Sequence, residues 1–283
     1  MIKNFDLTDW ICFSDRRNSK SYMSKDKKWM VKFGTEFTKV SYDDLIKEQQ
    51  MTQRVLNIGV KTPKVGDIVE LPNGEIGLIY EFIEGKKSIS RAVSEDLENI
   101  DYYMKRFAHI AKDEHSKVCD VNQFESMEDR IRTEILRRDI LSDKQKEKAL
   151  KFLDTVEKKN NCVHGDFHPG NYIITSDKEY AIDIGQIAYG NPDFDIAVFY
   201  YFCFYFSPDV TKKLFHCEEK YLKTMWKSFI KYYFDTNDEK TLDEITKKYA
   251  KYALVCFFAQ FKFINPDIEI NNAMEKYFDK EFI

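Results

Sequence analysis

The stretch that decides the fold of this chain is VHGDFHPGNYII at residues 163–174, with YAIDIGQ at residues 180–186 shortly after it. Asp166 follows an apolar pair, and Asn171 comes five residues later, across a Pro-Gly turn that rules out a continuous helix. Asp183 ends a short apolar strand and precedes Ile-Gly, which lets the chain turn away. We therefore expect three oxygen-bearing side chains at loop positions, and the first two can face one site.

This set of side chains suits the transfer of a phosphoryl group. Enzymes catalyse that reaction mostly by positioning the reactants and by neutralising charge with magnesium. One carboxylate is needed to orient an acceptor hydroxyl, and further oxygen atoms are needed to bind the metal. Carboxylate and amide oxygens are ligands that a hard divalent cation accepts. The pattern therefore predicts a phosphoryl-transfer site.

A metal site formed by the two histidines of this stretch is the alternative. His164 and His168 are four residues apart, which is the spacing of zinc-binding H-E-x-x-H pairs. Those pairs need an unbroken helix, whereas this segment contains two glycines and a proline. The histidine pair is therefore the weaker interpretation.

The D-x-x-x-x-N spacing with a later D-x-G resembles the catalytic and metal loops of protein kinases. Its H-G-D-x-H-x-x-N form resembles the aminoglycoside phosphotransferase and choline kinase superfamily of small-molecule kinases. The resemblance implies that Asp166 is the catalytic base, that Asn171 and Asp183 bind Mg²⁺, and that His164 shapes the loop. It also implies that Asp195 braces the catalytic loop. Capping of a helix N-terminus by Asp193 or Asp195 is the alternative, and the two roles are compatible.

An ATP-binding half is expected upstream of this site. Lys32 lies within the strand pattern at 28–33 and is the candidate phosphate-binding lysine, although an edge-strand lysine facing water is the alternative. A capping-box pattern at 41–44 precedes an amphipathic helix at 45–58, with Glu48 on its apolar stripe. A carboxylate there needs a partner, so we expect an ion pair between Glu48 and Lys32. A solvated glutamate is the alternative.

Two strands are predicted at 65–71 and 76–82, joined by a Pro-Asn-Gly turn. The second runs into GLIYEFIEG, which resembles the hinge of these kinases. Backbone groups near Glu81 to Ile83 are therefore expected to bind the adenine of ATP, with GTP as an open alternative.

The segment that matches the phosphate loop of the superfamily, residues 14–22, contains no glycine. Members of the superfamily usually have glycines there, because bare backbone can approach an anion closely. The hydroxyls of Ser19 and Ser21, or the cations of Arg17 and Lys20, could contact phosphate instead. A solvated basic turn is the alternative. The absence of glycine puts the affinity for nucleotide in doubt.

The chain after about residue 87 is predicted to be mainly helical, in the stretches 95–115, 128–139, 143–158, 192–206, 218–234, 238–264 and 270–280. The first stretch ends at His115, which we expect to be a structural histidine. The aromatic run at 196–206 is shorter than the roughly 20 residues of a membrane span, so it predicts a buried helix.

No apolar leader opens the chain, and the six cysteines form no C-x-x-C pair. These features predict reduced, mostly buried thiols in a cytoplasmic protein.

The charge distribution bears on the partner. Residues 1–85 carry 13 basic and 13 acidic side chains, so the formal net charge of −4 belongs to residues 86–283, with 31 and 35. Such a balance disfavours nucleic acid as a partner. A mildly acidic surface would suit a cationic acceptor such as an aminoglycoside or an amino alcohol.

These observations predict an α+β, bilobal, protein-kinase-like fold. We expect an N-lobe at 1–85 with a small antiparallel sheet and one helix, and a larger helical C-lobe at 86–283. The expected function is an ATP-dependent phosphotransferase acting on a small-molecule hydroxyl. One alternative is a catalytically weak nucleotide-binding regulator. The other is a protein kinase, which the short stretch between Asp183 and Asn191 disfavours because it leaves little room for a peptide-docking loop. The sequence leaves the oligomeric state open.

Overall fold

The computed structural model describes residues 3–16, 19–34, 40–139, 141–206, 208–260 and 280. The chain packs as two compact units. Unit 1 comprises Met1–Lys87 and Ile173–Gly185, and unit 2 comprises Ser88–Tyr172 and Gln186–Ile283. Unit 1 thus includes a segment that the sequence placed in the C-lobe. The functional division into two lobes at residue 85 stays a prediction.

Unit 1 is built on a six-stranded sheet with the strand order β1-β5-β6-β4-β3-β2. Strand β1 pairs with β5 in parallel, and the other pairs are antiparallel. The strands predicted near 28–33, 65–71 and 76–82 are confirmed as β4, β5 and β6. The bounds are β1 Lys3–Asn4, β2 Trp10–Arg16, β3 Ser19–Ser24, β4 Trp29–Phe33, β5 Val65–Glu70 and β6 Ile76–Glu81.

The sheet buries apolar side chains on both faces, because successive residues of a strand point in opposite directions. Val31, Phe33 and Val69 form the core of one face. On the other face, Ile68 and Leu78 pack against the helix α1, Tyr42–Asn57. This helix begins at Ser41, whose side chain forms the predicted capping box with Asp44.

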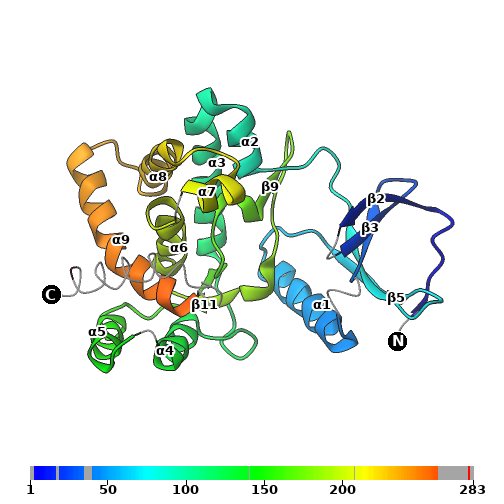
Figure 1. Cartoon of the computed structure of the whole chain (residues 1–283), viewed down its shortest axis with the longest axis horizontal. Helices are drawn as coiled ribbons and strands as arrows, with labels where there is room; N and C mark the ends of the chain where they lie inside the picture. Colours follow the sequence, from blue (N-terminus) through cyan, green and yellow to red (C-terminus); the bar gives the residue numbers. More distant parts are fainter. Residues whose placement is uncertain are drawn as a thin grey trace. The chain divides into compact units, whose positions relative to one another are not determined.

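Unit 2 is mainly helical, as predicted (Figure 1). Helix α3 packs on α8, α6 on both α8 and α9, and α4 on α9. The bounds are α2 Ile89–Glu95, α3 Ile100–Ser116, α4 Met127–Arg137, α5 Asp143–Asp154, α6 Asp193–Phe204, α7 Pro208–Phe215, α8 Glu219–Tyr233 and α9 Glu239–Gln260.

Helix α2 was not among the predicted helical stretches, the first of which began at residue 95. Helix α7 was not predicted, because its eight residues give too short a pattern to stand out between two longer helices. The stretch predicted at 270–280 lies outside the described residues, apart from residue 280.

Helix α6 is apolar on nearly all sides, and its residues from Phe194 to Cys203 are buried. This burial confirms the interpretation of the aromatic run as a core helix. Among the described residues, no helix combines the length and apolar character needed to cross a membrane. All six cysteines are free thiols, and all but Cys12 are buried, as predicted.

Short elements carry the candidate site residues. Strands β8 and β11 pair antiparallel, with Val163 opposite Ala188. Strands β7, β9 and β10 form a sheet in the order β10-β9-β7. The bounds are β7 Lys87–Ser88, β8 Asn161–Val163, β9 Tyr172–Ile174, β10 Glu179–Ala181 and β11 Ala188–Gly190, with 3-10 helices η1 Leu97–Asn99, η2 Pro169–Asn171 and η3 Ile184–Gln186.

Candidate active site

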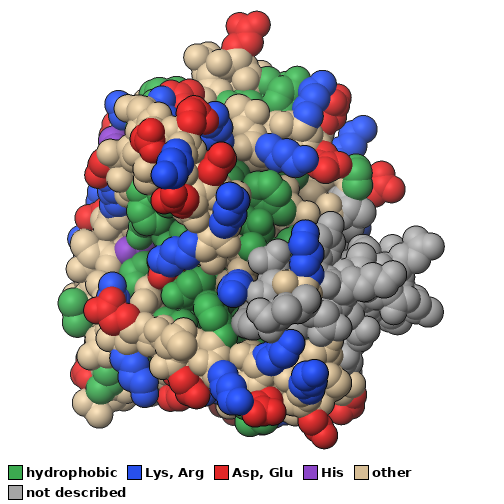
Figure 2. Space-filling view, turned by 90° about the vertical axis from the view of Figure 1, so that its left-hand side faces the viewer, with side chains coloured by type: hydrophobic (Ala, Val, Ile, Leu, Met, Phe, Trp, Pro, Cys, Tyr) green, Lys and Arg blue, Asp and Glu red, His purple; other side chains and the backbone are tan. Residues whose placement is uncertain are grey.

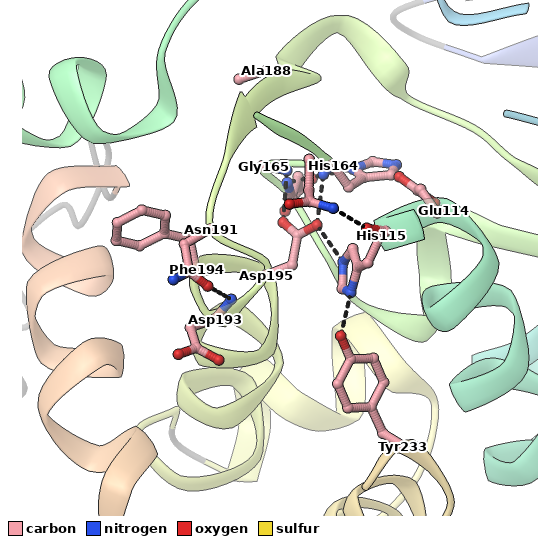
Figure 3. Close-up of polar contacts among 12 residues, drawn as sticks. Glu114, His115, His164, Gly165, Ala188, Asn191, Asp193, Phe194, Asp195 and Tyr233 are labelled. Atoms are coloured by element: carbon pink, nitrogen blue, oxygen red, sulfur yellow. Dashed lines mark hydrogen bonds and ion pairs between the residues drawn. The ribbon is translucent and has the colours of Figure 1, made fainter. Parts of the chain in front are cut away.

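The loop between β8 and β9, residues 164–171, is held by the carboxylate of Asp195 (Figure 3). The His164 amide donates to Asp195 Oδ2 at 2.6 Å, and the Gly165 amide donates to Oδ1 at 2.9 Å. His115 Nε2 lies 3.0 Å from Asp195 Oδ2. The Asp195 side chain is fully buried. Its charge is therefore compensated by three N–H groups, two of which belong to the loop.

The cap alternative for Asp195 is not observed. Helix α6 begins at Asp193, so Asp195 is the third helical residue and Pro192 occupies the cap position. An acidic side chain in the first turn of a helix is also stabilised by the helix dipole. Asp195 thus contacts the loop from a favourable helical position.

His115 connects this carboxylate to helix α8. Its Nδ1 lies 2.8 Å from the Tyr233 hydroxyl, while its Nε2 faces Asp195. Burial, followed by the charges of Asp193 and Asp195, raises the pKa of Tyr233, which therefore stays a neutral hydroxyl. Both ring nitrogens of His115 are engaged, in line with the structural role expected for it.

Glycine is required at position 165 for two reasons. Its φ angle is 82°, in the region that side chains disfavour. In addition, a Cβ atom there would lie only 2.7 Å from the Gln186 carbonyl oxygen. His164, next to it, is fully buried. These two residues set the path by which the chain leaves β8 and presents Asp166.

Asp166 and Asn171 are in direct contact. Asn171 Nδ2 donates to the carbonyl oxygen of Asp166 and to its carboxylate Oδ2, both at 2.9 Å. Because the Asn171 NH₂ group is used in this way, its amide oxygen points elsewhere and is available as a metal ligand. The structure therefore brings together the predicted base and one predicted magnesium ligand.

Asp183, in unit 1, is the second residue after β10 and has a φ angle of 58°. A left-handed residue other than glycine is uncommon, and Asp is among the types that tolerate it. Its side chain is exposed. Within the described chain, its carboxylate forms no hydrogen bond or ion pair. A free carboxylate and a free amide oxygen are hard ligands, so the residues present fit Mg²⁺. No cluster of three His, Cys, Asp or Glu side chains occurs among the residues that the structure describes.

The expected ion pair between Lys32 and Glu48 is not formed among the described residues. Instead, Glu48 Oε1 accepts a hydrogen bond from the Tyr80 hydroxyl at 2.6 Å. Lys32 and Glu48 are both exposed. Lys32 pairs with Leu78 across the strands β4 and β6, and Leu78 packs against α1, so Lys32 lies on the face of the sheet that α1 covers. Lys32 and Glu48 thus lie on the same side of the sheet, as predicted. The predicted ion pair between them is wrong, because the Glu48 carboxylate binds the Tyr80 hydroxyl instead.

The main-chain groups of the predicted hinge, Glu81 to Ile83, differ in their hydrogen bonds. The Glu81 amide donates to the Lys64 carbonyl at 2.7 Å, and the Phe82 amide donates to the Lys28 carbonyl at 2.8 Å. For Ile83, no main-chain hydrogen bond is formed with any described residue. A free amide and carbonyl at Ile83 could pair with an adenine ring.

The glycine-free phosphate segment is a β-hairpin of β2 and β3. Ser21 is buried and pairs with Lys32 of β4, so the two side chains point to the same face. The Ser19 side chain and Arg17 lie outside the described residues.

Sequence reasoning missed two contacts that hold the loop region. The Tyr172 hydroxyl donates to Glu114 Oε2 at 2.8 Å, and both side chains are buried (Figure 3 shows Glu114 beside His164). His168 Nδ1 accepts the Gly170 amide at 3.0 Å and caps η2. The sequence motif contains His168, but its contact with η2 could not be predicted, because that contact depends on the geometry of the turn.

A loop with a buried carboxylate brace and an asparagine bound to an aspartate is the arrangement expected of a kinase-like phosphotransferase. The chain belongs to the phosphotransferase enzyme family, whose model matches residues 14–221. No curated protein sequence matches the chain.

Solved structures confirm the protein-kinase-like fold. A thermostable mutant of aminoglycoside phosphotransferase APH(4)-Ia, in ternary complex with AMP-PNP and hygromycin B, is similar with a TM-score of 0.63 and 12% identity, over 97% of this chain and 93% of that one. The gentamicin complex of APH(2")-IIa has a TM-score of 0.55 and 15% identity, over 98% and 94%. A choline/ethanolamine kinase family protein from Mesorhizobium loti has a TM-score of 0.54 and 12% identity, over 96% and 85%.

Proposed function

We propose that this protein transfers the γ-phosphoryl group of ATP to a hydroxyl group of a small molecule. The observation that carries the proposal is the contact of Asn171 Nδ2 with both the main chain and the carboxylate of Asp166. That contact fixes a carboxylate in a loop whose amides are themselves held by Asp195. A fixed carboxylate can orient a hydroxyl and accept its proton as the phosphoryl group moves.

Each remaining residue has a proposed role. Asn171 and Asp183 would bind Mg²⁺, which supplies positive charge next to the phosphates. Lys32 would bind the α- and β-phosphates, and Ser21 lies on the same sheet face. The free main-chain groups of Ile83 would bind the adenine.

The acceptor is proposed to be a small molecule with a hydroxyl group. The complexes with hygromycin B and gentamicin support this class for structurally similar proteins. The stretch after Asp183 consists of η3 and β11 and leads directly into α6, which leaves no long segment for docking a peptide. A protein acceptor is therefore disfavoured. On the face drawn in Figure 2, acidic and basic side chains are interspersed, so the cationic character of the acceptor rests on family resemblance.

A nucleotide-binding regulator with weak activity is the second candidate. The observation that favours it is the bond between Glu48 and Tyr80, which leaves Lys32 without its expected carboxylate partner in the described chain. If this arrangement persists with nucleotide bound, the lysine lacks the support expected for an efficient phosphotransferase.

The test measures transfer of labelled γ-phosphate from Mg-ATP to hygromycin B, gentamicin, choline and ethanolamine, with a protein extract as a parallel acceptor. Asp166→Ala is expected to lower kcat by about 10²–10⁴-fold, the range for loss of a general base, with nucleotide affinity largely kept. Asp183→Ala is expected to remove magnesium-dependent nucleotide binding instead. The matched control is Asp209→Ala, which changes an exposed aspartate in the first turn of α7.

Three outcomes would count against the proposal. Full turnover by the Asp166→Ala variant would remove the proposed base. Unchanged Mg-ATP affinity in the Asp183→Ala variant would contradict the metal role. Nucleotide binding by the wild type without transfer to any acceptor or to water would favour the regulator.

A further inference from the structure

His168 lies two residues after Asp166, and one of its ring nitrogens is fixed by the main chain. Its Nδ1 accepts a hydrogen bond from the Gly170 amide at 3.0 Å. A ring nitrogen that accepts a hydrogen bond has no proton, so the neutral imidazole must carry its proton on Nε2. The cap of η2 thus selects one tautomer of His168.

The protonated nitrogen faces the proposed base. His168 Nε2 lies 3.8 Å from Oδ2 of Asp166, and Asn171 Nδ2 donates to the same oxygen at 2.9 Å. Oδ2 thus accepts one hydrogen bond, from Asn171, and has the imidazole Nε2 as a second polar neighbour just beyond hydrogen-bond distance. In the described part of the chain, no hydrogen bond or ion pair involves the other oxygen, Oδ1. The two oxygens of one carboxylate are in different environments.

The imidazole ring is held by aromatic packing as well as by the cap. The rings of Phe202 and Phe215 meet it edge-on, with centroids at 4.8 Å and 5.7 Å. Both phenylalanines are buried. A Cβ atom at position 170 would lie 2.7 Å from the His168 ring, so the glycine there makes room for it. These contacts fix the direction of Nε2 without help from a ligand.

We infer that His168 is a positioning residue: together with Asn171 it holds Oδ2 of Asp166, so that Oδ1 is the atom that accepts the proton. This inference rests on the proposed phosphotransfer. In that step, the acceptor oxygen forms a bond to the γ-phosphorus and its proton moves to Oδ1. The bond from the γ-phosphorus to the bridging oxygen breaks, and ADP leaves with the electron pair.

Two substitutions separate this role from the capping role of His168. His168→Asn keeps an acceptor near the position of Nδ1, so it can still cap η2, but it has no group near Asp166. His168→Gln extends an NH₂ group to about the reach of Nε2 and loses the cap. We expect His168→Asn to lower kcat about tenfold with an unchanged KM for ATP, because Oδ2 loses a polar neighbour, and His168→Gln to restore most of that loss.

The probe is release of phosphate from labelled Mg-ATP, with water in place of the acceptor hydroxyl, so no acceptor need be known. The matched control is His109→Asn, which changes an exposed histidine of α3. Thermal unfolding of each variant confirms that it is folded. If His168→Asn is as active as the wild type, or more active than His168→Gln, the histidine serves only the cap and the inference is overturned.

The failure of the proposed function gives a different result. In that case the wild type itself shows no magnesium-dependent release or transfer of phosphate. The arrangement of His168 is then tested by the nitrogen chemical shifts of its ring at a pH where the imidazole is neutral. A proton on Nε2 supports the geometry, and a proton on Nδ1 overturns it.

Discussion

The loop at 164–171 in unit 2 and the strands around Lys32 in unit 1 differ in how their polar side chains are held. In unit 2, Asp195 is fully buried and its carboxylate binds two loop amides and a histidine. In unit 1, Lys32 and Asp183 are exposed and neither forms an ion pair with a described residue. The first region is organised by the fold itself. The second presents charged groups whose partners are expected to be the nucleotide and its metal.

This contrast predicts the largest effect for Asp195. Asp195→Ala leaves the His164 and Gly165 amides and one nitrogen of His115 buried without their acceptor. Each buried donor left without an acceptor costs about 1–3 kcal/mol. Chemical denaturation measures the loss, and Asp183→Ala is the matched change in unit 1, where the exposed carboxylate predicts almost none. Equal losses for the two variants would remove the contrast.

Glu114 predicts a second effect, which depends on pH. Burial raises the pKa of this carboxyl, and the negative charge of Asp195 raises it further, whereas His164, His115 and the hydrogen bond from Tyr172 lower it. The folded protein therefore keeps a proton that the unfolded chain releases. Stability contributed by this group is present below the ordinary pKa of glutamate and is lost as pH rises toward the raised value.

Glu114→Gln removes that titration and keeps an acceptor for Tyr172. In the range above the ordinary pKa of a glutamate, we expect the wild type to lose up to about 1.4 kcal/mol per pH unit relative to the variant. Denaturation at several pH values gives the free energy of unfolding of each protein as a function of pH. The difference between the two curves reports on Glu114, because the contributions of the other titratable groups cancel. Parallel curves would show that Glu114 is ionised in the folded protein.

The sequence predicted the parts of the molecule that are governed by local rules. The capping box at Ser41 and Asp44, the strands around Lys32, and the core helix α6 follow from periodicity and turn chemistry, which act over a few residues. The motif at 163–174 also placed Asp166 and Asn171 on one short loop, because five residues across a turn cannot carry them far apart.

The contacts of Glu48 and His168 could not be predicted, for a physical reason. Glu48 lies on the face of α1 that meets the sheet, where both Lys32 and Tyr80 point toward the helix. The choice between a lysine and a tyrosine depends on the side-chain reach and the strand register, which a single sequence does not fix. The bond from the Gly170 amide to His168 likewise depends on the dihedral angles of a turn.

The smallest expected effect concerns unit 1, where Glu48 binds Tyr80 and not Lys32. Tyr80→Phe removes the hydroxyl that binds Glu48 and leaves an exposed carboxylate that water can solvate, so we expect a stability loss of at most about 1 kcal/mol. If Tyr80 and Lys32 compete for Glu48, the variant frees the carboxylate for the lysine and binds Mg-ATP more tightly than the wild type. Calorimetric titration measures this affinity, and Glu48→Gln in the same background should cancel the gain. An unchanged affinity in Tyr80→Phe would show that the bond between Tyr80 and Glu48 does not restrain Lys32. The weak-regulator candidate would then lose the observation that favours it, because the fold would present Lys32 to phosphate as readily with the tyrosine as without it.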